Sequence, residues 1–161
     1  MSSTLRIAPA EPCHLPVILS FIRKLAEFEK LLDYVTADED VLRTNLFGPN
    51  RVAEVALAWR DEEPAGFAVY FRNFSTFLGQ PGIYLEDLFV EPTYRGTGVG
   101  TALLRYVAHV AKQSSAGRLE WAVLDWNQPA IDFYRRLGAV PMHDWTIFRV
   151  TGEALDRLAS G

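Results

Sequence analysis

The residues with the clearest chemical potential form a glycine-rich segment, residues 95–100, with the sequence RGTGVG. It lies between a predicted strand that ends near Val90 and an amphipathic helix that starts near Gly98. Glycine lets a backbone approach a ligand closely, and the free N–H groups at a helix N-terminus, together with the helix dipole, bind anions. Arg95 and Thr101 can add charged and hydroxyl contacts to a phosphate. The segment therefore predicts a site for a phosphate-bearing ligand.

Two familiar phosphate-binding motifs do not fit this segment. A dinucleotide fingerprint, G-x-G-x-x-G, read from Gly96 or Gly98 requires a third glycine at Thr101 or Leu103. A P-loop requires a lysine after its last glycine, and no lysine lies near the segment. The alternative to a ligand site is a turn that needs glycine only for positive φ angles and tight packing.

Two adjacent carboxylates, Glu86 and Asp87, precede the glycine segment on a predicted strand. Successive strand side chains point to opposite faces, so regular alternation predicts that at most one of them faces a site directly. From the residues alone, Glu86 also fits an exposed position, since most carboxylates stay at the surface. Tyr134 shares helical spacing with Ile131 and Leu137, which is typical of a core aromatic residue.

The cysteine and histidine side chains show no spacing that indicates a catalytic or metal site. The chain has one cysteine, Cys13, which excludes an intrachain disulfide. The histidines His14, His109 and His143 have no catalytic partner in the sequence, and no metal-ligand spacing is present. We therefore predict no metal site.

Hydrophobic periodicity predicts the elements that position these residues. Apolar residues at intervals of three and four predict helices, and short alternating or apolar runs bounded by turn residues predict strands. The resulting order is strand, two helices, three strands, helix, strand, helix, strand and a final short helix, which indicates one α/β domain with a mixed sheet over residues 1–161. The predicted strands are 5–8, 52–59, 65–74, 83–90, 119–124 and 146–150, and the predicted helices start near 18, 37, 98, 129 and 153.

Length and composition limit the class of protein. With 161 residues, of which 49% are hydrophobic and 22% charged, the chain fits a single core. A net charge of −4 argues against a nucleic acid partner, which normally requires a basic patch. There is no apolar run of about 20 residues and no apolar leader at the N-terminus, so we expect no membrane association and a cytoplasmic location.

Three segments resemble a known superfamily. Residues 95–100 fit the R/Q-x-x-G-x-G/A signature of the GNAT superfamily of acyl-CoA-dependent N-acetyltransferases, and residues 84–90 (YLEDLFV) and 125–139 (DWNQPAIDFYRRLGA) resemble it in order and separation. Residues 25–31 (LAEFEKL) and 123–128 (VLDWNQ) are similar to the diamine acetyltransferase family, which includes spermidine/spermine and thialysine acetyltransferases. Both strings are nearer to the thialysine branch, and the resemblance covers nearly the whole chain.

The resemblance implies a fold and a reaction. The expected fold is the GNAT α/β fold, with a mixed central sheet flanked by helices. The expected enzyme is an N-acetyltransferase that moves an acetyl group from acetyl-CoA, as co-substrate, directly to a primary amine of a small molecule, with no metal and no covalent enzyme intermediate. The family is commonly dimeric, so a homodimer is expected.

The resemblance also assigns roles to residues. An amine of pKa near 10.4 must lose a proton before attack, so the reaction needs a base. Glu86 matches the family residue that is thought to act on the amine through water. Tyr134 matches a general acid that protonates the departing thiolate. Backbone groups of the strand are expected to pair with the pantetheine amides. The implied acetyl-CoA residues are Leu88, Phe89, Val90, Arg95, Gly96, Thr97, Gly98, Val99, Gly100, Thr101, Asn127 and Tyr134, and the implied amine-site residues are Phe28, Glu29, Glu86, Asp87 and Trp126.

Two of these residues also fit structural roles that need no ligand. Asn127 precedes Pro129 near a helix start, where asparagine caps helices. Glu29 is predicted to face solvent on the helix pattern alone.

The acceptor amine is less well specified than the donor. Compared with the polyamine branch, an acidic pair after Glu29 is reduced to Leu32-Asp33, and the loop over residues 140–144 is shorter and less acidic, which argues against long polycations. The alternatives are another amine (an aminoglycoside, an amino acid or a protein N-terminus) or a non-catalytic acyl-CoA-binding domain. The presence of Glu86 and Tyr134 favours catalysis.

Overall fold

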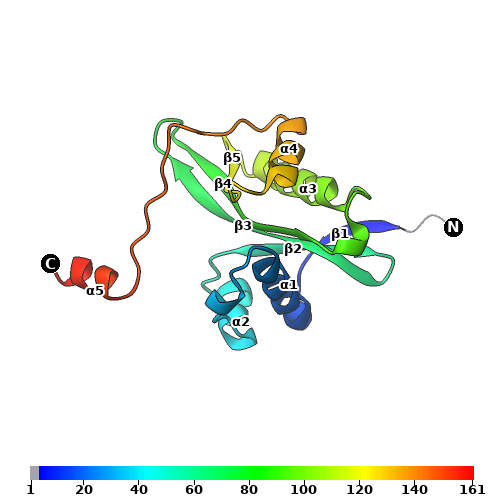
Figure 1. Ribbon diagram of the computed structural model, residues 1–161, viewed down its shortest axis with the longest axis horizontal. Coiled ribbons are helices and arrows are strands. Elements are labelled where there is room, and N and C mark those ends of the chain that lie inside the picture. The colour runs from blue at the N-terminus through cyan, green and yellow to red at the C-terminus, as the bar shows by residue number, and fades with distance from the viewer. Residues whose placement is uncertain (1–3) are drawn as a thin grey trace. The chain divides into compact units, whose positions relative to one another are not determined.

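The computed structural model describes residues 4–161. The chain divides into two compact units: the first ends at Ala122, and the second is Val123–Gly161. The first unit contains the sheet and three helices, whereas the second contains two short helices (Figure 1).

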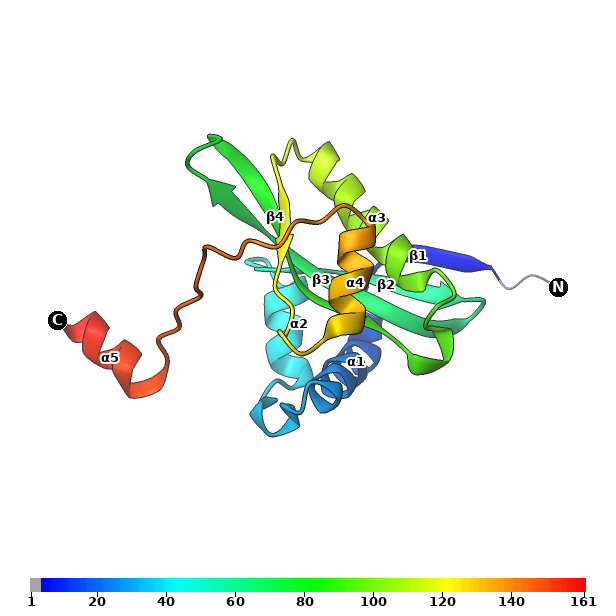
Figure 2. The same cartoon turned by 45° about the horizontal axis from the view of Figure 1, so that its top comes forward.

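The first unit is built on a five-stranded sheet, which is mixed, as predicted. The strand order follows the sequence, with antiparallel pairs from β1 to β4 and a parallel pair between β4 and β5. The hairpin of β3 and β4 is long, and its connecting turn projects beyond the rest of the sheet (Figure 2). The strands are β1 (Leu5–Pro9), β2 (Glu54–Arg60), β3 (Glu63–Ser75), β4 (Gln80–Val90) and β5 (Leu119–Trp121).

One face of the sheet is covered by α1 (Leu15–Phe28) and α2 (Glu39–Phe47) (Figure 1). Phe21 of α1 packs between Phe67 of β3 and Phe89 of β4, with ring centroids 5.5 and 5.3 Å apart. Burial of large aromatic side chains is among the strongest contributions to a core, so this cluster fixes α1 against the end of β4. The C-terminus of α1 is thereby held near the strand that carries Glu86 and Asp87.

The opposite face is covered by α3 (Val99–Gln113), which contacts four strands (Figure 1). Its buried stripe includes Val99, Leu103 and Val107. This helix starts directly after the glycine-rich segment, so its packing fixes the position of its own N-terminus. Short 3-10 turns connect several elements: η1 (Pro12–His14), η2 (Leu32–Tyr34) and η3 (Pro92–Tyr94).

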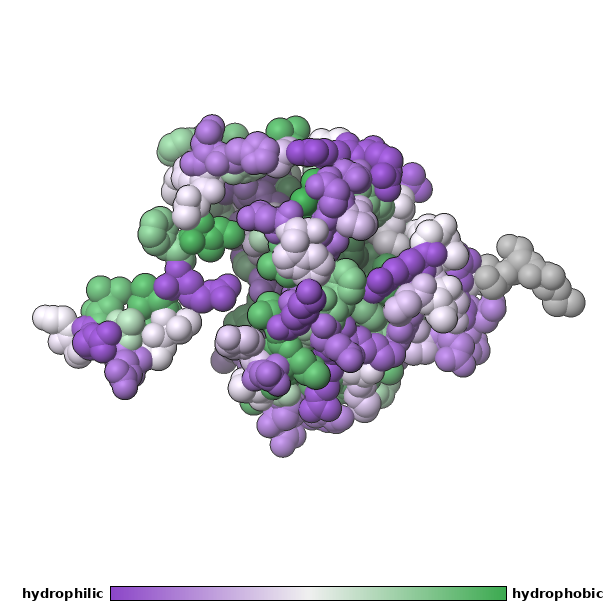
Figure 3. All heavy atoms as spheres, viewed as in Figure 1, coloured by the Kyte–Doolittle hydropathy of each residue, from purple (hydrophilic) through white to green (hydrophobic). Residues whose placement is uncertain are grey.

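The second unit contains α4 (Gln128–Arg136) and α5 (Gly152–Ser160). Gly138 follows the end of α4 with φ +89°, the left-handed conformation in which glycine commonly ends helices. Leu155 and Leu158 of α5 are exposed, so this amphipathic helix shows apolar as well as hydrophilic surface (Figure 3). None of the helices in residues 4–161 is long and apolar enough to cross a membrane.

Two predicted strands need correction. The strand predicted at residues 146–150 is wrong: no residue of this stretch joins a strand ladder, although Ile147, Phe148 and Val150 supply the apolar residues. Apolar residues of this kind form a strand only when a neighbouring strand supplies hydrogen bonds, and none in the described part of the chain does so here. The strand predicted at 119–124 is shorter, because β5 ends at Trp121.

Candidate active site

The glycine turn, defined as residues 95–100, connects η3 to α3. Gly96 and Gly98 have φ angles of +73° and +91°, a region that side chains with Cβ rarely adopt. A Cβ added to either glycine would meet no atom within 4 Å. The glycines are therefore required for backbone conformation, and the space next to them is open to a ligand.

The N-terminus of α3 presents backbone donors at this open side. The first hydrogen bond of the helix joins the Ala102 N–H to the Gly98 carbonyl, 3.0 Å apart. Within residues 4–161, the N–H groups of Gly98, Val99 and Gly100 donate to no acceptor. Such orphan donors, at the positive end of a helix dipole, suit a pyrophosphate, so the turn has the properties predicted for an anion site.

Arg95 ties the glycine turn to the rest of the first unit. Its Nε donates to the Val90 carbonyl at 3.1 Å, and its guanidinium lies 5.1 Å from the ring centroid of Phe28 and 6.0 Å from that of Phe89. These contacts connect the turn with the end of β4 and with the last residue of α1. The predicted phosphate contact of Arg95 stays a prediction, and the observed contacts stabilise the turn.

A β-bulge interrupts β4 at Glu86. Val69 of β3 pairs with Asp87 and Tyr70 pairs with Leu85, so Glu86 has no partner residue on β3. A bulge inserts an extra residue into one strand and redirects side chains around it. Glu86 is exposed and Asp87 is half-buried, so the two carboxylates differ in burial, and the expectation that at most one of them faces the site stays a prediction.

The pKa values of neighbouring groups show where the two carboxylates lie. Glu86 is close enough to raise the pKa of the Asp87 carboxyl and, after burial, that of the Tyr84 hydroxyl. Asp87 itself is held mainly by burial, then by Glu86 and Glu29, at a pKa of about 6. A raised pKa means that the ionised carboxylate is disfavoured, and a nearby cation stabilises that ionised form.

Glu29 completes a carboxylate cluster, which we define as Glu29, Glu86 and Asp87. It follows the last residue of α1 and is half-buried, and burial raises the pKa of its carboxyl. The prediction that Glu29 faces solvent therefore holds only in part, because Glu29 is the C-cap of α1, directly after its last residue Phe28, and is half-buried. The cluster suits a protonated amine.

The edge of β4 is open beside the cluster. β5 pairs with β4 only at Ile83, Tyr84 and Leu85. Residues 86–90 continue past the end of β5, and no described strand pairs with them on that side. This stretch contains the three residues, Leu88, Phe89 and Val90, whose backbone groups are predicted to pair with pantetheine, and Val90 uses its carbonyl to accept from Arg95.

Three predicted site residues, Trp126, Asn127 and Tyr134, belong to the second unit. The Asn127 side chain accepts a hydrogen bond from the Ala130 N–H at 3.4 Å and so caps α4, as its position near the helix start predicted. Tyr134 is half-buried, and its ring lies 5.4 Å from that of Phe133. The catalytic and acetyl-CoA roles of these residues stay predictions.

Sequence reasoning missed one residue at the glycine turn. Arg60, the last residue of β2, donates from Nη2 to the Thr97 carbonyl at 2.6 Å. The contact joins residues 37 positions apart. The sequence gives no signal for it, because arginine is common at hairpin ends and the partner is a backbone atom.

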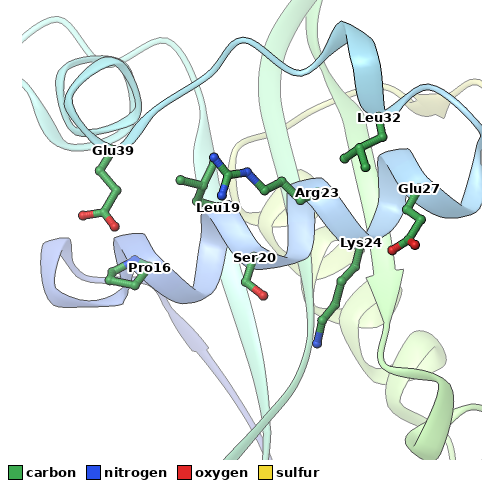
Figure 4. A pocket seen from close by; sticks show the side chains of 8 residues that line it. All are labelled: Pro16, Leu19, Ser20, Arg23, Lys24, Glu27, Leu32 and Glu39. Atoms are coloured by element: carbon green, nitrogen blue, oxygen red, sulfur yellow. The ribbon is translucent and has the colours of Figure 1, made fainter.

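A hollow of about 360 Å³ lies beside α1 (Figure 4). Arg23, Lys24, Glu27 and Glu39 are among its lining residues, and their charges are mixed. None of its lining residues belongs to the predicted amine or acetyl-CoA residues. Within residues 4–161, no three His, Cys, Asp or Glu side chains are grouped to hold a metal ion.

Comparison of the sequence with known families and curated proteins supports the resemblance. The family described as acetyltransferase (GNAT) matches residues 19–139. A thialysine N-epsilon-acetyltransferase of Bos taurus is 41% identical over 153 residues, covering 88% of this chain and 89% of that protein. The L-ornithine N5-acetyltransferase of Arabidopsis thaliana is 30% identical and covers 95% of this chain and 87% of that protein.

Comparison with solved structures supports the fold. An integron cassette protein from the mobile metagenome of V. cholerae matches with a TM-score of 0.83 and 24% identity, covering 99% of this chain and 100% of that chain. An aminoglycoside acetyltransferase from an uncultured soil metagenomic sample matches with a TM-score of 0.76 and 19% identity, covering 91% and 95%. Together with the sheet and the glycine turn, these comparisons show that the chain is an acetyltransferase of the GNAT family.

Proposed function

We propose that this enzyme transfers an acetyl group from acetyl-CoA to a primary amine of a small, lysine-like or diamine molecule, directly and within a ternary complex. The observation that carries the proposal is the position of the carboxylate cluster beside the glycine turn. Arg95 links the two, because it belongs to the turn and lies over Phe28, the residue before Glu29. An anion site for the donor and an acidic site for an amine therefore meet at the end of β4.

The residues of the first unit fit acetyl-CoA. The orphan N–H groups of Gly98, Val99 and Gly100 suit its pyrophosphate, and the open edge of residues 86–90 suits its pantetheine amides. When bound, acetyl-CoA supplies an acetyl thioester as the acyl donor. A backbone N–H of residues 88–90 is proposed to polarise the thioester carbonyl.

The carboxylate cluster attracts the amine and takes its proton. Burial is the main cause that raises the pKa of Asp87 to about 6, and repulsion by Glu86 adds to it; an ammonium between Asp87 and Glu86 offsets both effects. Glu86 accepts the proton, directly or through a water, so that the amine nitrogen has a free lone pair for attack on the carbonyl carbon. The carbon–nitrogen bond forms, the carbon–sulfur bond breaks and the amide remains on the acceptor.

Tyr134 protonates the departing thiolate. A phenol of pKa about 10 donates to a thiolate whose conjugate acid has a pKa of about 8.5 at a modest energetic cost, so its position must favour the transfer. No nucleophile of the enzyme is acylated in this scheme. On the resemblance, Asn127 is assigned to coenzyme A binding and Trp126 to amine binding.

The curated relatives support a lysine-like acceptor. Their names specify thialysine and L-ornithine, which both present a primary amine on a side chain. The solved aminoglycoside acetyltransferase is too dissimilar to carry its substrate over, since 19% identity supports the fold only. Three carboxylates at the site suit one or two positive charges rather than a long polycation.

We also propose a cytoplasmic homodimer. The second unit exposes large apolar side chains at Met142, Trp145, Ile147 and Phe148. Large exposed apolar surfaces on soluble proteins are commonly covered by a partner subunit. The only cysteine, Cys13, is free, as expected for a reducing compartment.

An amine panel tests the proposed function. Thiol release from acetyl-CoA is measured with thialysine, lysine, ornithine, putrescine, spermidine, an aminoglycoside and a peptide with a free N-terminus. The highest kcat/KM is expected for thialysine, ornithine or a short diamine. Activity confined to the peptide would refute the small-amine acceptor, and tight binding of acetyl-CoA without turnover on any amine would indicate a binding domain.

A further inference from the structure

The contact between Arg60 and Thr97 holds the peptide that joins Thr97 to Gly98 in the glycine turn. Arg60 is paired on both sides, with Leu5 of β1 and Glu63 of β3, so its backbone is held in the sheet. The adjoining hairpin is also secured, because the Asp61 N–H donates to the Thr4 carbonyl at 2.9 Å. The guanidinium therefore reaches Thr97 from a rigid base.

The Thr97–Gly98 peptide has unusual freedom without this contact. Gly96 and Gly98 flank it, and glycine populates positive and negative φ about equally. The Thr97 hydroxyl and N–H both bind the Tyr94 carbonyl, at 2.7 and 3.4 Å, but these bonds hold only the N-terminal side of Thr97. On the C-terminal side, the contact with Arg60 holds the Thr97 carbonyl.

Holding this carbonyl also directs a donor. No peptide bond in residues 4–161 is cis, and in a trans peptide the C=O and the next N–H point in opposite directions. With the Thr97 carbonyl bound by Arg60, the Gly98 N–H must point away from Arg60, and it has no acceptor within the described chain. It adjoins the orphan N–H groups of Val99 and Gly100.

We propose that Arg60 is a positioning residue for pyrophosphate binding: its bond to the Thr97 carbonyl fixes the orientation of the Gly98 N–H toward the donor's pyrophosphate. This rests on the proposed use of acetyl-CoA. Arg60 acts through the backbone of the turn and touches no reacting atom. Its loss should weaken binding of the donor and leave the acetyl transfer step intact.

The test compares Arg60→Gln with the wild-type enzyme and with Arg72→Gln, which removes an exposed arginine from β3. Arg60→Gln should raise the KM for acetyl-CoA about tenfold, with kcat and the amine KM within about twofold of wild type. S-acetyl-pantetheine lacks the pyrophosphate, so its kcat/KM should be the same for both enzymes. Arg72→Gln should match wild type throughout.

Ionic strength separates positioning from simple charge attraction. A positioning effect should keep the same KM ratio at low and high salt, whereas attraction by an exposed charge is screened. A ratio that falls to one at high salt, an unchanged KM for acetyl-CoA, or an equal loss with S-acetyl-pantetheine would each overturn the role of Arg60. Failure of the wild-type enzyme itself to bind acetyl-CoA would instead overturn the proposed function.

Folding of the variant is checked by thermal unfolding and by the amide NMR spectrum. The Gly98 amide signal should shift in Arg60→Gln without ligand, while signals of α1 stay in place. If Arg60→Gln does not fold, Arg60→Lys replaces it with the same measurements, because a compact ammonium does not reproduce the guanidinium geometry. A Gly98 signal unchanged in a folded variant contradicts the proposal.

Discussion

The glycine turn and the carboxylate cluster are neighbours, but they are built from different groups. The turn offers backbone N–H groups whose directions follow from two positive φ angles and from the start of α3. The cluster offers side chains whose properties follow from burial and mutual repulsion. A backbone site is insensitive to pH, whereas a site that contains a half-buried carboxylate with a raised pKa, here Asp87, is not.

This difference suits the two ligands. The donor carries the same pyrophosphate in every turnover, and fixed backbone donors recognise it without titrating. The acceptor arrives as a cation and must lose a proton, which requires groups that can exchange protons. Changes in the two regions should therefore have separable effects on the donor KM, the acceptor kcat/KM and the pH profile.

The largest effect is expected at the carboxylate cluster. Glu86→Gln should lower kcat/KM for the amine by about 100-fold or more, because it removes the base, and should leave the acetyl-CoA KM within about twofold. Steady-state kinetics with each substrate varied in turn measure both constants. Glu27→Gln, on the exposed side of α1, is the control and should have no effect. An acetyl-CoA KM that rises as much as the amine kcat/KM falls would show that the two regions are not separable.

The next largest effect is on the free energy of unfolding, and it tests how much the ionised Asp87 carboxylate destabilises the folded enzyme. The pKa of Asp87 is raised from 3.8 to about 6, so its ionised form is disfavoured in the folded enzyme. The penalty is absent below about pH 4, grows between pH 4 and 6, and is complete above pH 6, where it amounts to on the order of 3 kcal/mol. The free energy of unfolding of Asp87→Asn relative to wild type should therefore increase by up to about that amount from pH 4 to pH 8.

Denaturant unfolding at several pH values measures this difference, and amine turnover should fall in the same variant. Sites that bind cations often retain such destabilising groups. A stability difference that does not change with pH would mean that Asp87 titrates normally in the folded enzyme. In that case the acceptor site would not depend on a strained carboxylate.

The sequence predicted the turn better than the cluster, for physical reasons. Glycine spacing before an amphipathic helix marks a backbone site directly, so residues 95–100 could be identified as an anion site without a structure. No sequence pattern predicts the bulge at Glu86, because the bulge depends on which residues of β3 pair with those of β4. The half-burial of Glu29 was not predicted, because it depends on the residue at which α1 ends.

The same limits explain the remaining differences. Arg60 binds a backbone carbonyl across 37 residues, and pairwise contacts with backbone leave no pattern in a single sequence. Residues 146–150 have the composition of a strand, but strand formation depends on a partner that composition does not reveal. Local periodicity predicted the other elements because helices and hairpins depend mainly on nearby residues.

A smaller effect is expected from backbone strain in the turn. Gly98→Ala places a Cβ at φ +91° and should cost about 1–2 kcal/mol of stability, with a rise of about tenfold in the acetyl-CoA KM as the donors move. Gly79→Ala is a matched control, because Gly79 has φ +63° and open space around it but lies in the turn between β3 and β4. It should lose similar stability and keep its acetyl-CoA KM. Equal KM values for the two variants would remove the turn from donor binding.

The smallest effect is expected from Glu29, and it separates the contributions of the three carboxylates of the cluster. Glu29 is the weakest of the three causes that raise the Asp87 pKa, after burial and Glu86. Glu29→Gln should therefore lower the pKa of Asp87 and move the acidic limb of the amine kcat/KM profile to lower pH, since Asp87 then stays ionised further into acid. Glu86→Gln should move the same limb further in the same direction. The acetyl-CoA KM should not change with pH in either variant over this limb, because backbone donors do not titrate; a donor KM that follows the acidic limb would place the cluster at the donor site as well.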